Sequence, residues 1–492
     1  MLTRGFVGSV LVLLGGLVVS TLPPSTWLMH HDLLLDLRGA EFGRMVGLAV
    51  VLLGLGILAA EWLSLCRHVA LADGEDREDA VNLVRHAAIV WSAPLVLAPP
   101  LFSRDGWSYA AQGMLAHLGI SPYEYGPGIL HGPVVEAVDP RWMDTATPYG
   151  PVPLMFGDFA AGLTGNPWVL VVCHRLLALV GLALLAWALP RLASWTAVNP
   201  ALASAVVLVS PLMLANGVGG LHNDLLMVGL MAAALVVGAE RGWGAGAVIG
   251  GLAAAVKVPG GLVCIGIALL SLPVAATLLQ RVRRLTSVAI VSLGTLFALG
   301  LLSGLGSGWV KGLTVPATVT TPLSVTTLAD NLVGGTGALR SVGSLVTALA
   351  ILAVAARWRT GIRADALHAV ALVTGLTVLL GPVVHLWYLL WVVPFLAVLR
   401  LSQLALAAVL AGSTIFGLVA PMDSSLHEAY YAIVLGSVLV GLLVPLLLLT
   451  RSSRDRIERI VSAEWIPHPR AGSTTPVTSP RAMVPPEVPG AA

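Results

Sequence analysis

The chain is poor in charge, in lysine and in cysteine. Only 11% of its 492 residues are charged, whereas soluble domains carry about 25%. Lysine occurs only at Lys257 and Lys311, and the net charge is +2, which excludes the concentrated basic surface that nucleic-acid binding needs. Cys66, Cys173 and Cys264 are an odd set without CxxC spacing. The cysteines therefore encode neither a disulfide framework nor a zinc site.

Long apolar runs recur along the whole chain. Hydrophobic residues make up 57% of it, and the mean hydropathy is +0.90. Only helices or closed barrels satisfy backbone polar groups in lipid, and runs of this length favour helices. No stretch between the runs is long enough to build a soluble core. The sequence predicts an all-α polytopic membrane protein with about 12–14 transmembrane helices. The fourteen candidate spans are residues 5–22, 45–65, 86–102, 168–189, 199–215, 222–239, 243–258, 260–279, 286–304, 339–356, 366–384, 386–399, 402–420 and 429–450.

The distribution of basic residues predicts the orientation. If the N-terminus is cytoplasmic, 19 of the 27 basic residues lie on the cytoplasmic side, as the positive-inside rule requires. Residues 1–450 then form one transmembrane domain, and residues 451–492 form a basic, Pro-rich, disordered cytoplasmic tail. The first span resembles a signal peptide, but Leu22-Pro23-Pro24 offers no small-x-small cleavage site, which favours a retained anchor.

Two long segments, 103–167 and 304–336, fall on the outer side. The first is rich in carboxylates and contains four of the seven tyrosines. Aromatic rings and carboxylates suit the apolar faces and hydroxyls of a sugar. We therefore expect Tyr109, Gln112, Tyr123 and Tyr149 to bind a sugar, although an aromatic belt at the membrane interface would also use tyrosine.

Asp105 is the candidate catalytic residue. It follows an apolar run that ends at Phe102 and precedes a helix expected over residues 106–118. A partly desolvated carboxylate there has its pKa raised and acts as a base toward a hydroxyl. The alternative is that Asp105 only caps the helix that follows.

Polar residues also occur at the outer ends of later spans. A lysine inside an apolar stretch, such as Lys257, costs roughly 2.5 to 3.5 kcal/mol at mid-bilayer and therefore has a partner or a function. Lys257 could snorkel to the interface, pair with a lipid phosphate, or pair with Asp224 structurally. The other candidates for the same outer cavity are His222, Asn223, His385 and Tyr388.

Five motifs together resemble a known family. They are SRDGWSYAAQG at 103–113, GISPY at 119–123, TPYGP at 147–151, GLHND at 220–224 and HLWY at 385–388. These motifs resemble the actinobacterial polyprenol-phosphate-mannose-dependent α-1,6-mannosyltransferases of the MptB type, within the GT-C superfamily. The likeness spans roughly residues 85–450.

The resemblance implies an enzyme and assigns roles to residues. It implies a GT-C-type helix bundle that transfers mannose from polyprenyl-phosphate-mannose to a lipid-anchored mannan with inversion, on the outer face of the plasma membrane. Asp105 would be the base. Many GT-C enzymes carry a second acid beside the first, whereas here Arg104 precedes Asp105.

The residues of the predicted site favour a sugar donor whose leaving group is a phosphate. A phosphate leaving group is already anionic, so a fixed cation, Lys257 with His222, can replace a general acid. Asn223, Asp224, His385 and Tyr388 would contact the sugar or the acceptor. No cofactor is expected, and a divalent metal is not expected either. Two alternatives stay open: a transporter or lipid flippase built around Lys257 and Asp224, and a GT-C enzyme that uses another lipid-linked sugar such as arabinofuranose.

Overall fold

The protein is a bundle of α-helices. The computed structural model describes residues 1–72 and 76–422, and this part contains no β-strand. Within the described residues, six helices are long and apolar enough to cross a membrane: α1 (Leu2–Val19), α3 (Glu41–Ala70), α8 (Pro167–Ser194), α13 (Leu278–Leu302), α17 (Ala338–Arg357) and α18 (Arg363–Leu380). The pair α9 (Pro200–Leu208) and η3 (Met213–Gly219) is bent by 62° and is either a broken seventh span or a re-entrant loop. The chain is therefore a multi-pass all-α membrane protein, as predicted.

Shorter helices complete the bundle and its outer segments. They are η1 (Trp27–His30), α2 (Asp32–Gly39), α4 (Asp76–Val96), α5 (Asp105–His117), η2 (Pro127–Ile129), α6 (Pro140–Met143), α7 (Pro151–Leu163), α10 (Asp224–Glu240), α11 (Trp243–Val256), η4 (Val258–Leu262), α12 (Val263–Leu270), α14 (Trp309–Gly312), α15 (Val315–Thr318), α16 (Val325–Leu332), η5 (Leu386–Trp391), α19 (Val393–Ala397), α20 (Gln403–Leu418) and η6 (Ala420–Met422).

The structure corrects several of the expected spans. A helix or helical turn occupies most of each expected segment up to residue 420, but some segments are broken at proline or glycine. Pro211 follows the end of α9 in the expected span 199–215, and Pro273 follows the end of α12 in the expected span 260–279. Proline removes a backbone donor and clashes with the preceding helical turn, so the helix cannot continue there. The expected span 429–450 and the tail 451–492 lie outside the described residues.

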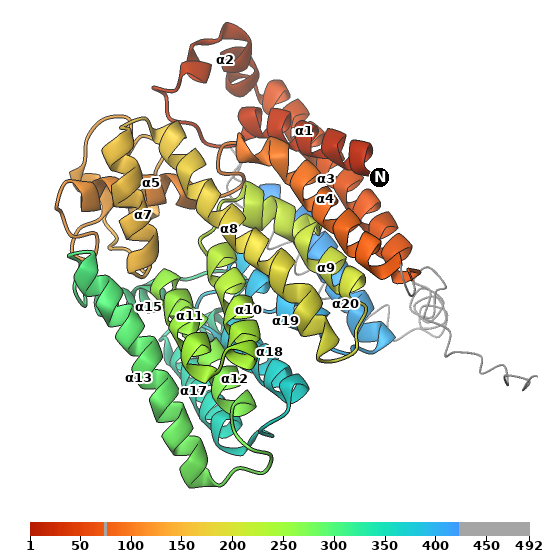
Figure 1. Ribbon diagram of the computed structural model, residues 1–492. Helices are drawn as coiled ribbons and strands as arrows, with labels where there is room; N and C mark the ends of the chain where they lie inside the picture. Colours follow the sequence, from red (N-terminus) through yellow and green to blue (C-terminus); the bar gives the residue numbers. More distant parts are fainter. Residues whose placement is uncertain (73–75, 423–492) are drawn as a thin grey trace, which may run out of the picture.

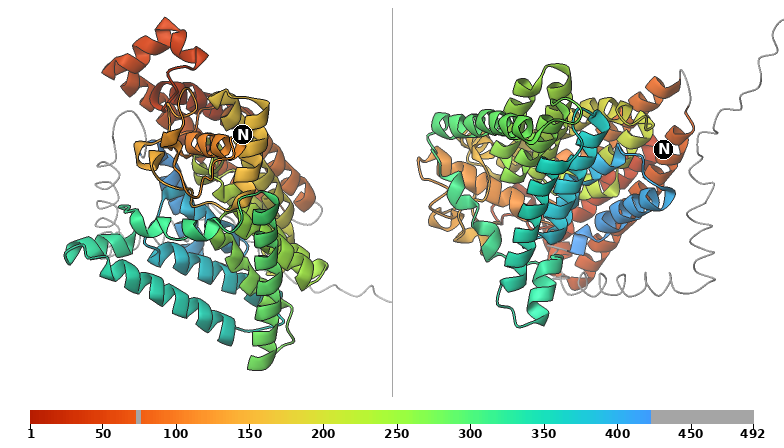
Figure 2. Two further views of the ribbon diagram at one scale, coloured as in Figure 1. Left: turned by 90° about the vertical axis from the view of Figure 1, so that its left-hand side faces the viewer. Right: turned by 90° about the horizontal axis from the view of Figure 1, so that it is seen from below.

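The helices are arranged in two groups around a central set. The helices α1, α3 and α4 run side by side, while α13, α17 and α18 lie at the opposite end of the molecule (Figure 1). Between them, α8 and α11 flank α10, which is almost completely buried. The short helices α5 and α7 pack against each other beside this central set (Figures 1 and 2). The segment 103–167 therefore covers one end of the bundle.

Glycine allows α5 and α7 to approach closely. A Cβ atom on Gly113 of α5 would lie 2.6 Å from the Cα atom of Gly157 in α7, closer than real Cβ contacts allow. The small residues therefore fix the position of α5 against α7. The helix α7 is too short to span the bilayer, since its 13 residues cover only about 20 Å.

A buried arginine joins the two turns that lead into the site. Arg175 of α8 is fully buried, and its guanidinium donates five hydrogen bonds to backbone carbonyls. Its acceptors belong to the turn after α4 and to the end of η3, and they are Val96, Ala98, Pro99, Val218 and Gly219. Guanidinium has five N–H donors in a rigid fork, so this one side chain satisfies carbonyls that no helix pairs.

Both turns contain strained backbone. Phe102 has a φ of 61° and Leu221 has a φ of 57°, a left-handed conformation that costs a bulky L-residue of order 1–3 kcal/mol. Such strain persists only where contacts with the surrounding structure hold the backbone in that conformation. Arg175 provides part of this constraint, and the hydrogen bond from Leu101 N to Gly219 O, 2.9 Å long, joins the turns directly.

We expect the substitution Arg175→Met to destabilise the protein strongly. It leaves up to four buried carbonyls without a donor, since Gly219 O keeps its bond from Leu101 N. Each is worth about 1–3 kcal/mol, so the free energy of unfolding should fall by more than about 3 kcal/mol. Thermal unfolding of the detergent-solubilised protein measures this loss. The control is Arg85→Met, because Arg85 of α4 is part-buried and bonds to only one backbone carbonyl, that of Ala186. Equal melting temperatures for the two variants would contradict the prediction.

Candidate active site

Asp105 is the first residue of α5, but it does not cap the helix. The N-cap residue is Arg104, and no side chain caps this end. The Asp105 side chain is 9% exposed and turns toward the interior. Its Oδ2 accepts a 3.4 Å hydrogen bond from the hydroxyl of Tyr109 and lies 3.6 Å from Nδ1 of His222. Capping does not explain this residue.

The pKa of Asp105 shifts in the direction opposite to the one expected from the sequence. Burial acts to raise the pKa of the Asp105 carboxyl, as predicted, but the adjacent His222 imidazole and other nearby positive groups outweigh burial and lower that pKa to about 2. The carboxyl is therefore ionised throughout the neutral range. It can accept a proton there, but it is a weaker base than the sequence predicted.

Lys257 forms a buried ion pair with Asp224. Lys257 ends α11 in extended backbone before Pro259, and its Nζ lies 2.8 Å from Oδ1 of Asp224, the first residue of α10. Trp391 donates a 2.6 Å hydrogen bond from Nε1 to the same oxygen. Asp224 is 0% exposed, and its Oδ2 has no hydrogen-bond partner. Of the three explanations offered for Lys257, the structure contains the pairing with Asp224.

Aromatic rings surround the Lys257 ammonium group. Its Nζ lies 4.4 Å from the ring centroid of Tyr388, 5.1 Å from that of Trp391 and 5.4 Å from that of Tyr149. Aromatic faces attract a cation at these distances. Lysine has three N–H donors, and Lys257 uses one for Asp224. The Tyr388 hydroxyl is a second hydrogen-bond partner of the ammonium group, which leaves one donor for an anion in the cavity.

A stack of rings separates His222 from the cavity. The indole of Trp387 lies between two imidazoles, with its ring centroid 3.7 Å from that of His222 and 4.3 Å from that of His385. His222 is 1% exposed, whereas His385 lines the cavity. His222 therefore faces Asp105 from behind the cavity lining, and its predicted contact with a donor phosphate stays a prediction.

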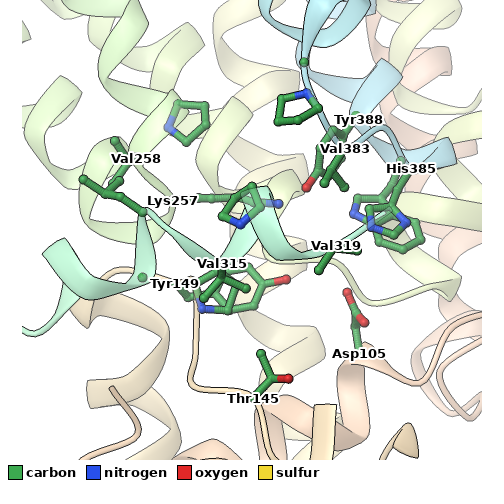
Figure 3. Close-up of a pocket in the computed structure, with 18 of the residues that line it drawn as sticks. Asp105, Thr145, Tyr149, Lys257, Val258, Val315, Val319, Val383, His385 and Tyr388 are labelled. Atoms are coloured by element: carbon green, nitrogen blue, oxygen red, sulfur yellow. The ribbon is translucent and has the colours of Figure 1, made fainter. Parts of the chain in front are cut away.

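One cavity of about 350 Å³ brings most of the predicted residues together. Seven of the eleven predicted residues line it: Asp105, Tyr109, Gln112, Tyr149, Lys257, His385 and Tyr388. They come from the α5 region, the segment before α7, the α11–η4 junction and the η5 turn. Figure 3 shows Asp105 and Lys257 on the walls of this space.

Four predicted residues lie outside the lining of this cavity. His222, Asn223 and Asp224 are buried behind it. Tyr123 packs in a separate apolar cluster with Trp309, and its hydroxyl has no partner. The predicted contacts of Tyr123, Asn223 and Asp224 with a sugar or acceptor, and of His222 with a donor phosphate, stay predictions, since none of these side chains is in the cavity lining.

Sequence reasoning missed several residues in the cavity lining. Trp142, Thr145, Trp387 and Trp391 lie in or near motifs already recognised, and the aromatic rings of the three tryptophans were the available signal. The segment 304–336 was singled out as an outer segment without site residues, yet it contributes a wall. That wall consists of Gly312, Leu313, Val315, Pro316 and Val319.

Comparison with known proteins identifies the family. A family model described as "Alpha-(1->6)-mannopyranosyltransferase, N-terminal domain" matches residues 2–273, more than half of the chain, and one described as "MptB C-terminal domain" matches residues 314–450. The chain belongs to this α-(1→6)-mannopyranosyltransferase family. It is a glycosyltransferase enzyme, and the predicted MptB-type resemblance is confirmed.

Two relatives illustrate the similarity within this mannosyltransferase family. Alpha-(1->6)-mannopyranosyltransferase A of Mycobacterium tuberculosis is 32% identical over 451 residues, which cover 87% of this chain and 85% of the relative. Alpha-(1->6)-mannopyranosyltransferase B of Corynebacterium glutamicum is 28% identical over 487 residues, which cover 88% and 79%. No solved structure matches the chain.

The described part of the chain contains no group of three or more His, Cys, Asp or Glu side chains arranged to hold a metal ion. The polar chemistry of the cavity instead rests on one carboxylate, one ammonium group, and phenol, imidazole and amide side chains.

We expect the Asp224–Lys257 pair to behave as a coupled unit in stability. Removal of one partner, by Asp224→Asn or Lys257→Met, leaves an uncompensated buried charge and costs about 3–5 kcal/mol. The double variant should be less destabilised than the sum of the single variants, because no lone charge remains. The melting temperatures of the wild type, the two single variants and the double variant in detergent provide this double-mutant cycle. Additive losses would show that the two charges do not depend on each other.

Proposed function

We propose that this mannosyltransferase takes mannose from polyprenyl-phosphate-mannose and adds it to a lipid-anchored mannan through an α-1,6 linkage, as in the backbone of lipomannan or lipoarabinomannan. One observation carries the proposal. A single buried cavity contains both a carboxylate, Asp105, and an ammonium group, Lys257. The first suits an acceptor hydroxyl, and the second suits the phosphate of a donor.

The cavity walls support a lipid-linked donor. Besides the aromatic rings around Lys257, the lining includes the apolar residues Val258, Pro259, Val315 and Pro316. An isoprenoid chain can remain in contact with such side chains while its phosphate reaches the ammonium group. A nucleotide sugar has no comparable need for an apolar wall, and the described residues include no soluble nucleotide-binding domain.

The proposed reaction is a single inverting displacement. Asp105 accepts the proton of the acceptor 6-hydroxyl as this oxygen attacks the anomeric carbon. The bond to the phosphate breaks with its electron pair, and Lys257 stabilises the negative charge that develops on the polyprenyl phosphate. One carboxylate suffices because the leaving group needs no strong acid. A β-linked donor then yields the α-linked product.

The site is proposed to face the outside of the plasma membrane. With both termini in the cytoplasm, the basic residues concentrate on the inner side, as the positive-inside rule requires. The segment 103–167, which begins beside Asp105 and covers one end of the bundle, then lies outside. His222 is assigned a role in holding Asp105, and Asp224 in holding Lys257, because neither reaches the cavity.

We expect Asp105→Asn to lower the rate of mannose transfer about 10²- to 10⁴-fold, the range for loss of a general base. The assay is elongation of an α-1,6-dimannoside by membranes that contain the variant and labelled polyprenyl-phosphate-mannose. The matched control is Asp144→Asn, which removes an exposed carboxylate from the same outer segment and should leave the rate unchanged. Full transfer by the Asp105 variant would falsify the base assignment.

A further inference from the structure

Two tyrosine hydroxyls connect Asp105 with the Lys257 end of the cavity. Tyr109 follows Asp105 by one helical turn of α5, and its hydroxyl donates to Asp105 Oδ2 at 3.4 Å. The hydroxyl oxygens of Tyr109 and Tyr149 are 2.9 Å apart. The ring of Tyr149 faces Nζ of Lys257 at 5.4 Å. A row of three polar groups therefore runs from Asp105 through the two hydroxyls, and it ends at the tyrosine whose ring faces the proposed phosphate site.

The two tyrosines are poorly placed to act only as sugar ligands. Tyr109 is 2% exposed and Tyr149 is 7% exposed. Their rings pack edge to face, with centroids 5.1 Å apart and planes at 86°. Each hydroxyl already has the other as a partner. A sugar could stack on these rings only after the pair separated, whereas a proton can pass through the pair as it stands.

The electrostatic environment keeps both phenols protonated. Burial raises the pKa of Tyr109 and of Tyr149 above the usual value, and the charges of nearby carboxylates add to this effect. With Asp105 ionised, Tyr109 donates to the carboxylate, and Tyr149 can donate to Tyr109. Before the reaction, each hydroxyl in the row therefore donates its hydrogen bond toward Asp105. Once Asp105 is protonated, the hydroxyls can rotate so that each donates in the opposite direction, toward Lys257.

The proposed reaction creates a need for such a path. The acceptor proton arrives on Asp105, at one side of the cavity, while negative charge develops on the departing phosphate at the other. An alkyl phosphate has a second pKa near 6, so it holds a proton far better than Asp105 does. The buried position of Asp105 limits direct release of that proton to water.

We propose that Tyr109 and Tyr149 form a proton relay that carries the acceptor proton from Asp105 to the leaving phosphate. This inference rests on the proposed function, since it takes the polyprenyl phosphate as the proton's destination. It assigns the two hydroxyls to proton transfer instead of the sugar binding that the sequence predicted for them.

The steps balance in atoms and charge. The acceptor oxygen loses its proton to Asp105 and bonds to the anomeric carbon, and the bond from that carbon to the phosphate oxygen breaks. Asp105 passes the proton to the Tyr109 oxygen, and Tyr109 passes its own proton to Tyr149. Tyr149 then gives its proton to a phosphate oxygen. The products are the extended mannan and polyprenyl hydrogen phosphate, with all three side chains restored.

The test is a kinetic comparison of Tyr109→Phe, Tyr149→Phe and the double variant. The hydroxyls are removed while the packed rings remain. Each single variant should lower the single-turnover rate about 10- to 100-fold, which is at or below the lower end of the range of about 10²- to 10⁴-fold for a general acid or base that contacts the substrate. The KM values for donor and acceptor should change less than about two-fold, because binding is retained. The double variant should be no slower than the slower single variant, since either gap interrupts the relay.

Controls separate this proposal from a structural role and from failure of the proposed function. Tyr125→Phe removes a half-exposed hydroxyl from the same outer segment and should leave the rate unchanged. Gel filtration in detergent should show the same monodisperse peak for every variant. Raised KM values with unchanged single-turnover rates would overturn the relay and restore sugar binding, and so would additive losses in the double variant. If the wild-type protein transferred no mannose from the lipid donor, the proposed function itself would fail.

Discussion

The geometry of the site depends on one buried guanidinium. Arg175 donates to carbonyls at both the end of η3 and the turn after α4. Each of these turns carries a bulky residue in left-handed backbone just before a site residue, Phe102 before Asp105 and Leu221 before His222. Because one rigid fork joins both turns, the relative position of the carboxylate and the imidazole is set by hydrogen bonds and does not rely on apolar packing alone.

The charges of the site are compensated in two separate pairs. Asp105 lies beside His222, and Lys257 lies beside Asp224. Each pair has one member in the cavity lining and one member buried behind it. A lone buried charge is costly, whereas a paired one is tolerated. The arrangement lets a carboxylate and an ammonium group share one largely apolar cavity without neutralising each other.

The sequence indicated the helices and the residue types of the site, but not their exposure. The helix over residues 106–118 was predictable because an apolar run ends at Phe102 and helix-forming residues follow. Lys257 was conspicuous because a lysine in an apolar stretch needs a partner. Tyr123 looked equivalent to Tyr109 and Tyr149, yet its ring packs on Gly308. That contact joins two outer segments nearly two hundred residues apart, and local sequence does not predict it.

The sequence by itself determined that the chain is helical and crosses a membrane, because lipid leaves backbone polar groups no partner outside a helix and apolar length is a local property. Only the tertiary structure decided which polar residues share the cavity and which support it from behind. It also decided that the pKa of Asp105 falls instead of rising. Burial alone would raise it, and the opposing imidazole comes from a turn more than one hundred residues away. Electrostatic effects depend on distance in space, which sequence separation does not measure.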